Sequence, residues 1–280
     1  MKAIILAAGK GTRLHPLTLT RPKHLVPVGG KPIVDYLLMA LKQAGIDEVI
    51  FIVNYKAEHL KDYLGSGAAY GMKFEYAVQK QLDGTADATA YAESFVKEDF
   101  MLTYGDWLTT SKAIRTVIQT HEKEKPTITM AVVPVKNPEH YGIVELDDAL
   151  VKGIIEKPDR AKAPTNLANA GIYILSTDIF EAIKRTKLST RGELEITDSF
   201  SILLETGHKI AAAKVAKNEM LDVGILWDLF DANRWALERI KLSIEGQIED
   251  GVHLIGQVSV EDGARIRSGA YIEGPVFIGK

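Results

Sequence analysis

A six-residue repeat of aliphatic residues near the end of the chain is the feature that most restricts its fold. Aliphatic residues recur at every sixth position from Ile248 to Ile278, and a second series from Val252 to Val276 keeps the same period. Glycines fall at the turn position of three hexads, at Gly251, Gly263 and Gly269. This pattern is typical of a hexapeptide parallel β-helix, in which successive coils stack the same aliphatic residues in one column.

We therefore predict a short left-handed parallel β-helix over residues 246–280. The repeat stops in its sixth hexad, after about two coils, so we expect a truncated part of a longer β-helix. Hexapeptide helices often trimerise or carry acyltransferases, but two coils are too few for an acyl-transfer site by themselves. We expect a homo-oligomer, for which the full β-helix would favour a trimer.

Residues 1–226 show short apolar runs that alternate with helical patterns and predict a separate domain. Strands are expected at 3–8, 49–53, 73–78, 100–104, 127–135, 141–146, 151–155, 169–175, 209–215 and 220–223. Helices are expected at 33–45, 58–64, 86–96, 108–124, 178–185 and 195–205. The alternation predicts an α/β fold with a Rossmann-like, doubly wound, mostly parallel sheet. A linker helix over 227–245, with its amphipathic pattern at 227–244, would lead out of this domain.

Composition excludes several classes of partner. The net charge of −3 lacks the basic excess of a nucleic-acid binder. There is no cysteine, which excludes thiolate metal sites and fits a reducing compartment. No signal peptide or apolar run long enough to span a membrane is apparent. We expect a cytoplasmic protein with neither a nucleic acid nor a membrane as partner.

The loop after the first predicted strand has the composition of a phosphate-binding loop. Gly9 and Gly11 follow the apolar run, and Arg13 and Lys23 add two cations. A strand that ends in a glycine turn leaves backbone N–H groups free to bind phosphate oxygens. A dinucleotide fingerprint would need a third glycine where Leu14 stands, and no Gly-Lys-Ser/Thr follows for a Walker A loop. An ordinary tight turn is the remaining alternative.

This segment resembles the signature of the sugar-1-phosphate nucleotidylyltransferases. The resemblance covers the pattern LAAGxGTRLxPLT from Leu6 to Thr18 and PKxLxP from Pro22 to Pro27. It is greatest for the glucose-1-phosphate thymidylyltransferase and N-acetylglucosamine-1-phosphate uridylyltransferase branches, in which a C-terminal β-helix also occurs. The resemblance implies that a nucleoside triphosphate and a sugar 1-phosphate give a nucleotide-sugar and pyrophosphate.

The resemblance also implies roles for four charged residues. Arg13 would hold the departing β- and γ-phosphates, and Lys23 would hold the reacting phosphates. Asp106, which ends a predicted strand, would be both catalytic and a ligand of Mg²⁺, and Asp222 would be the second metal ligand. Mg²⁺ is typically bound by one or two carboxylates together with substrate phosphates. A turn or a helix cap is the alternative for either aspartate.

Eight positions match the family's nucleotide-binding residues. They are Leu6, Ala8, Gly9, Gly11, Thr12, Gln79, Gly84 and Thr85. A side-chain amide at Gln79 offers a donor and an acceptor together, which suits the imide edge of uracil or thymine. This favours UTP or dTTP over GTP or ATP. Without the resemblance Gln79 would be interpreted as a surface residue, with Gln81 a nearby competitor.

Five positions match the family's sugar-phosphate side: Gly142, Glu156, Lys157, Asn169 and Glu193. Glu156 and Asn169 would bind sugar hydroxyls, and Lys157 would bind the phosphate of the sugar. For Glu156 and Lys157 the alternative is an exposed charge pair of little value. For the segment 191–198 it is a helix start, and from that segment we expect only Glu193 near the sugar.

Three alternatives stay open at the level of the sequence. A guanylyltransferase that makes GDP-mannose shares the opening signature, although Gln79 argues against it. A non-catalytic regulatory subunit should lack the charged residues, which are all present here. A longer parent chain could also acetylate an amino sugar. The sequence does not decide between glucose 1-phosphate and N-acetylglucosamine 1-phosphate, or between UTP and dTTP, which differ by one methyl group.

Overall fold

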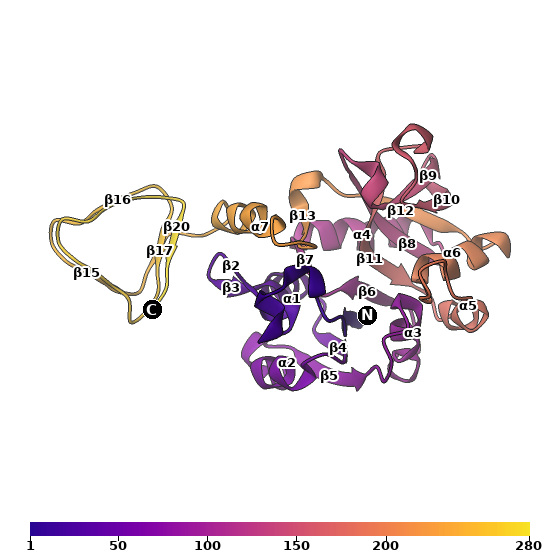
Figure 1. Cartoon of the computed structure of the whole chain (residues 1–280), viewed down its shortest axis with the longest axis horizontal. Helices are drawn as coiled ribbons and strands as arrows, with labels where there is room; N and C mark the ends of the chain where they lie inside the picture. Colours follow the sequence, from indigo (N-terminus) through magenta and orange to yellow (C-terminus); the bar gives the residue numbers. More distant parts are fainter.

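Nine strands of the computed structural model, which describes residues 1–280, form one central sheet (Figure 1). Their order across the sheet is β5-β4-β1-β6-β11-β8-β12-β10-β9. The strands are β1 (Ala3–Ala7), β4 (Glu48–Val53), β5 (Lys73–Val78), β6 (Phe100–Tyr104), β8 (Ile128–Pro134), β9 (Gly142–Asp147), β10 (Leu150–Glu156), β11 (Leu167–Leu175) and β12 (Ile210–Lys214).

The sheet is mixed, and the prediction of a mostly parallel sheet is therefore wrong for its C-terminal half. Strands β1, β4, β5 and β6 are parallel, and so are β8 and β12. By contrast, β11 is antiparallel to β6 and β8, and β9 and β10 are antiparallel to each other. The reason lies in the connections. A tight turn with Asp148 at a positive φ joins β9 to β10, and no α-helix lies between β10 and β11.

Helices cover both faces of the sheet. On one face α1 (Ile33–Gln43), α2 (Ala57–Leu64) and α4 (Ser111–Glu124) pack into a core of 31 buried residues. On the other, α3 (Thr85–Ala90), α5 (Ile179–Arg185) and α6 (Ile196–Glu205) pack into a core of 25. Ile4 and Ile5 belong to different cores because successive strand residues point to opposite faces. None of the helices combines the length and the apolar character needed to cross a membrane.

Three predicted helices are shorter in the structure by three or more residues. The helix expected at 86–96 ends at Ala90, and a 3-10 turn (Glu93–Phe95) follows. The helix expected at 108–124 begins only at Ser111, because Trp107–Thr109 forms strand β7, antiparallel to β13 (Met220–Asp222). The helix expected at 227–244 is α7 (Asp228–Leu237). Residues 243 and 244, which the prediction placed in this helix, form strand β14 instead.

The C-terminal hexads stack in parallel, as predicted. Strands β14 (Ser243–Ile244), β15 (Gln247–Ile248), β16 (His253–Ile255), β17 (Val258–Val260), β18 (Arg265–Ile266), β19 (Tyr271–Glu273) and β20 (Val276–Ile278) trace a triangular outline (Figure 1). Paired strands lie about three hexads apart, with His253 beside Tyr271. We call this part the coil. Its buried core is small, comprising Val258, Val260, Ala264 and Ile266. The handedness of the coil stays a prediction.

A third, smaller cluster of the main body joins α7 to a short hairpin. The hairpin consists of β2 (Pro27–Val28) and β3 (Lys31–Pro32). The cluster, called the α7 cluster below, comprises nine buried residues: Leu14, Val26, Val28, Ile33, Leu108, Val223, Ala232, Trp235 and Ala236.

Candidate active site

The glycine loop and Asp106 lie side by side because β1 and β6 are parallel neighbours. The Gly105 backbone N–H donates to the Leu6 carbonyl at 3.0 Å, just where both strands end. Strand β1 lies between β4 and β6, so the strand order reverses beside it, and this edge is a topological switch point of the sheet. Ligands of doubly wound sheets bind in the crevice at the carboxyl ends of strands at such a position.

The shape of the loop depends on two glycines for different reasons. Gly11 has φ of 64°, and a Cβ atom there would lie 3.1 Å from Lys23 Cβ and 3.2 Å from Thr18 Cγ2. Gly11 therefore lets the loop pack directly against Lys23. Gly9 is exposed, and a Cβ atom there would meet nothing within 4 Å. The space beside Gly9 is open to a ligand, as a phosphate-binding loop requires.

Lys23 and Asp106 form a largely buried ion pair. Lys23 Nζ lies 2.5 Å from Asp106 Oδ2, and Lys23 is only 6% exposed. Burial by itself would raise the pKa of Asp106, but the neighbouring Lys23 ammonium outweighs it and holds the pKa below its ordinary value. The second carboxylate oxygen, Asp106 Oδ1, is buried and has no hydrogen-bond partner. A buried charged oxygen without a partner is costly, which indicates that a ligand belongs there.

Asp222 approaches Asp106 through the pairing of β7 with β13. Asp222 lies opposite Trp107, and the Val223 N–H donates to the Asp106 carbonyl at 3.4 Å. Burial, and next the negative charge of Asp106, raise the pKa of Asp222 to about 7. Two close carboxylates with one unpartnered oxygen fit a divalent cation that takes hard oxygen ligands.

Arg13 reaches the same place from the glycine loop. A Cβ atom on Gly224 would lie 3.1 Å from Asp222 Oδ2, 3.4 Å from Asp228 Oδ2 and 3.6 Å from Arg13 Nη1. Asp228 accepts hydrogen bonds from the backbone N–H groups of Gly224 and Ile225, at 2.7 and 2.8 Å. The start of α7 therefore fixes the turn behind Asp222. All four predicted charged residues converge on one region.

His24 supports this region without carrying a charge. It is 4% exposed, and a Cβ atom on Gly105 would lie 2.7 Å from its Cδ2 atom. Burial lowers the pKa of His24 to about 4, so the imidazole is neutral at neutral pH. The ring packs under the backbone that carries Asp106.

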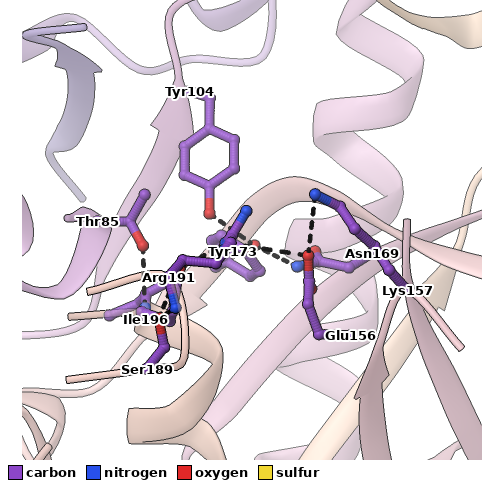
Figure 2. Close-up of polar contacts among 10 residues, drawn as sticks. Thr85, Tyr104, Glu156, Lys157, Asn169, Tyr173, Ser189, Arg191 and Ile196 are labelled. Atoms are coloured by element: carbon purple, nitrogen blue, oxygen red, sulfur yellow. Dashed lines mark hydrogen bonds and ion pairs between the residues drawn. The ribbon is translucent and has the colours of Figure 1, made fainter. Parts of the chain in front are cut away.

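The predicted base-binding residues lie together at the end of β5 and the start of α3. Gln79 is 2% exposed, and its Nε2 donates to Asp87 Oδ2 at 2.7 Å. A Cβ atom on Gly84 would lie 2.4 Å from the Leu194 carbonyl oxygen, so the backbone of 194 is what requires a glycine here. Thr85 Oγ1 accepts from the Ile196 N–H at 2.9 Å (Figure 2). The hydroxyl of Thr85 thus ties α3 to α6, and the role of these residues toward a base stays a prediction.

On the predicted sugar side, Gly142, Glu156 and Asn169 are neighbours. Gly142 pairs with Glu156 across β9 and β10, and a Cβ atom on it would lie 2.9 Å from Glu156 Oε2. Asn169 Oδ1 accepts from the Gly171 N–H at 3.1 Å, and its Nδ2 donates to the Tyr173 hydroxyl at 2.7 Å (Figure 2). The two hydrogen bonds fix the orientation of the Asn169 amide.

Charged residues line the outer part of this side. Lys157 Nζ lies 3.9 Å from Glu156 Oε1, and both side chains are nearly half exposed. Arg191 Nη2 donates to Glu195 Oε1 at 2.5 Å and lies 4.0 Å from Glu156 Oε1. The Glu193 side chain is exposed, and its carbonyl accepts from the Ser189 N–H. From the segment 191–198 Arg191 approaches Glu156, and a place for Glu193 near the sugar stays a prediction.

Comparison with known families agrees with this geometry. The model of the nucleotidyl transferase family matches residues 2–239, which is most of the chain. The chain belongs to the nucleotidyl transferase family. This nucleotidyl transferase thus carries its four converging charged residues inside the matched region.

Relatives of this nucleotidyl transferase have names that specify an activity. It is 38% identical to the bifunctional protein GlmU of Methanocaldococcus jannaschii over 94% of its own length and 61% of that protein. It thus spans less than two thirds of that relative. It is 34% identical to a glucose-1-phosphate thymidylyltransferase of Streptomyces griseus, over 100% of its own length and 78% of that protein. A solved structure of UDP-glucose pyrophosphorylase with UDP-glucose matches with a TM-score of 0.76 and 27% identity, over 85% of this chain and 98% of that one.

Sequence reasoning missed several polar residues of this nucleotidyl transferase. Tyr104 and Tyr173 have their hydroxyls 3.4 Å apart, and Tyr173 links them to Asn169 (Figure 2). Their apolar rings read as core residues, so no signal marked them. Arg191 and Glu195 belong to the segment 191–198, which the sequence analysis considers for the sugar side. Spacing along the chain does not show which of its side chains points inward.

Proposed function

We propose that this protein transfers a nucleotidyl group from a nucleoside triphosphate to a sugar 1-phosphate and releases pyrophosphate. The observation that carries the proposal is the convergence of Arg13, Lys23, Asp106 and Asp222 beside the glycine loop. An anionic phosphate oxygen must attack an anionic α-phosphorus, so neutralisation of charge and in-line positioning are the main tasks. Arg13 and Lys23, together with two carboxylates that fit a metal ion, can neutralise the charge and position the phosphates.

Within the site each charged residue has a distinct task. Lys23 is pre-oriented by Asp106 and would neutralise the reacting phosphates. Arg13 would hold the β- and γ-phosphates that depart as pyrophosphate. We propose Mg²⁺ as the cation, bound by Asp106 and Asp222; when bound, it would neutralise phosphate charge as a Lewis acid. Asn169 and Glu156 would fix the sugar, and Lys157 its phosphate.

We propose UTP or dTTP as the nucleotide and glucose 1-phosphate or N-acetylglucosamine 1-phosphate as the acceptor. The side-chain amide of Gln79 supports a pyrimidine imide through its Oε1, which can accept from the imide N–H, while its Nε2 is held by Asp87 Oδ2. The relatives named as a thymidylyltransferase and as a UDP-glucose pyrophosphorylase agree with this choice.

A pyrophosphate-release assay over four triphosphates and a panel of sugar phosphates tests the proposal. We expect turnover with UTP or dTTP, with Mg²⁺ present, and loss of turnover with EDTA. Asp106→Asn and Lys23→Ala should each reduce turnover by at least about a hundredfold and leave the fold intact, with a lowered thermal midpoint because one member of a buried ion pair loses its partner. Near-normal release in either variant, or turnover with GTP alone, would be incompatible with the assignment.

We also propose that the coil is left-handed and that the protein forms a homo-oligomer. The parallel hexads support the first part, and the exposed apolar residues of the coil, such as Ile255 at 44% and Tyr271 at 65%, support the second. Sedimentation equilibrium measures the mass in solution, and a strictly monomeric protein would refute the second part.

A further inference from the structure

Buried members of the α7 cluster follow all four charged residues of the proposed site closely in the chain. Each charged residue is followed within about three positions by a buried member of the cluster. The pairs are Arg13 with Leu14, Lys23 with Val26, Asp106 with Leu108, and Asp222 with Val223. Because close-packed interiors transmit displacements, an element that moves this cluster also moves the charged groups.

The hairpin β2–β3, which contributes Val28 to the cluster, follows Lys23 closely in the chain. The Gly29 N–H donates to Asn233 Oδ1 of α7 at 2.9 Å, and a Cβ atom on Gly29 would lie 2.6 Å from Ala236 Cβ. The Val28 carbonyl accepts from the Tyr36 hydroxyl at 2.7 Å. One side of the hairpin turn is therefore held directly on α7.

The other side of the turn is covered by the coil. A Cβ atom on Gly30 would lie 2.3 Å from Cε1 and 2.4 Å from Cδ1 of Phe277, which belongs to β20. Gly30 has φ of 87°, and Figure 1 shows the hairpin pointing toward the coil. Gly30 is thus a glycine both for its backbone angle and for the aromatic ring against it.

This contact is local. A cavity of about 610 Å³ lies between the coil, α1 and α7, and Tyr36, Arg239 and Phe277 are among its lining residues. The coil is therefore not packed continuously against the main body. The Phe277 side chain at the edge of this cavity can therefore hold the hairpin. Its removal would change this contact and leave the rest of the interface in place.

We propose that Phe277 is a positioning residue of the nucleotidyl-transfer site. Its ring presses the turn of the hairpin onto α7, and the hairpin in turn holds the segment that carries Lys23 at its place beside Asp106. Phe277 touches no substrate. This inference rests on the proposed function, because the effect of Phe277 is defined by turnover.

The test is steady-state kinetics of the full chain with Phe277→Ala. We expect kcat to fall at least about fivefold, while KM for each substrate changes less than about twofold, since the change misplaces a charge rather than a binding surface. Phe277→Tyr, which keeps the ring, should restore most of kcat. Tyr271→Ala removes an exposed aromatic of the same coil and is the matched control, with wild-type kcat.

A second variant protects the test against a simple loss of folding. In Gly30→Ala the new methyl group collides with the Phe277 ring, so adding Phe277→Ala should recover part of the lost kcat. Strictly additive effects of the two substitutions would contradict the contact.

Hydrogen exchange of the free protein separates this inference from the proposed function. Amides of residues 23–32 should exchange faster in Phe277→Ala than in the wild type, and not in Tyr271→Ala. If the wild type releases no pyrophosphate, the proposed function fails, and unchanged exchange would overturn the contact as well. If the wild type is active and Phe277→Ala keeps the wild-type kcat, the positioning role is overturned.

Discussion

Two glycines that the sequence assigns to the same nucleotide-binding set are required for different physical reasons. A Cβ atom on Gly9 would meet no other part of the chain within 4 Å, whereas Gly84 faces the backbone of Leu194 and has φ of 119°. The sequence placed both in a nucleotide-binding set by resemblance. It could not distinguish them, because the neighbour of Gly84 lies about a hundred residues further along the chain.

Substitution of these two glycines should therefore separate binding from folding. Gly9→Ala should leave the free energy of unfolding within about 0.5 kcal/mol of the wild type and raise KM for the triphosphate at least about tenfold, because the methyl group enters the open space offered to phosphates. Gly84→Ala should lower the free energy of unfolding by more than about 2 kcal/mol, because its Cβ collides with backbone.

Urea unfolding and initial-rate kinetics measure both effects. A Gly9→Ala enzyme with the KM of the wild type would show that the phosphates do not approach this glycine. A Gly84→Ala protein of wild-type stability would show that the chain around Leu194 can yield.

At the scale of elements, strands were easier to predict than helices. The predicted bounds of β5 and β6 are those of the structure. A continuous or alternating apolar run of five or six residues is typical of a strand. The helix predicted over 108–124 includes residues 108 and 109, which continue a helical pattern but belong to β7 (Trp107–Thr109) in the structure. Its actual state depends on pairing with residues 220–222, a long-range contact that local pattern cannot contain.

The boundary between β7 and α4 depends on Thr110. Its hydroxyl accepts from the Ala113 N–H at 3.3 Å and also contacts the Glu219 carboxylate. Thr110→Ala should lower the free energy of unfolding by about 1 kcal/mol, because an N-cap and a partly buried hydrogen bond are lost together. Thr110→Ser, which keeps the hydroxyl, is the control, and equal thermal midpoints for the two variants would be evidence against the cap.

At the scale of the whole molecule, the candidate site was more predictable than the sheet. The resemblance picked out Arg13, Lys23, Asp106 and Asp222. The parallel neighbours β1 and β6 bring the glycine loop beside Asp106, and Asp222 joins them through the pairing of β7 with β13. The antiparallel half of the sheet was not predictable, since the direction of β11 depends on a connection that has no helical signal.

The two parts of the molecule should differ in stability. The coil buries four residues in its core, whereas the two faces of the sheet bury 31 and 25. Amides of β16 and β19 should therefore exchange by local opening, and those of β1 and β6 only by global unfolding. Hydrogen exchange followed with increasing denaturant checks this. Identical opening free energies for the two sets would show that the coil and the sheet unfold as one unit.

The turn of the β2–β3 hairpin has a consequence for the construction of chimaeras. A coil transplanted from a relative that lacks an aromatic residue at the place of Phe277 would leave the backbone of Gly30 uncovered. The unit to exchange is therefore discontinuous in sequence. Residues 27–32 should be exchanged together with the coil, although more than two hundred positions separate the two segments.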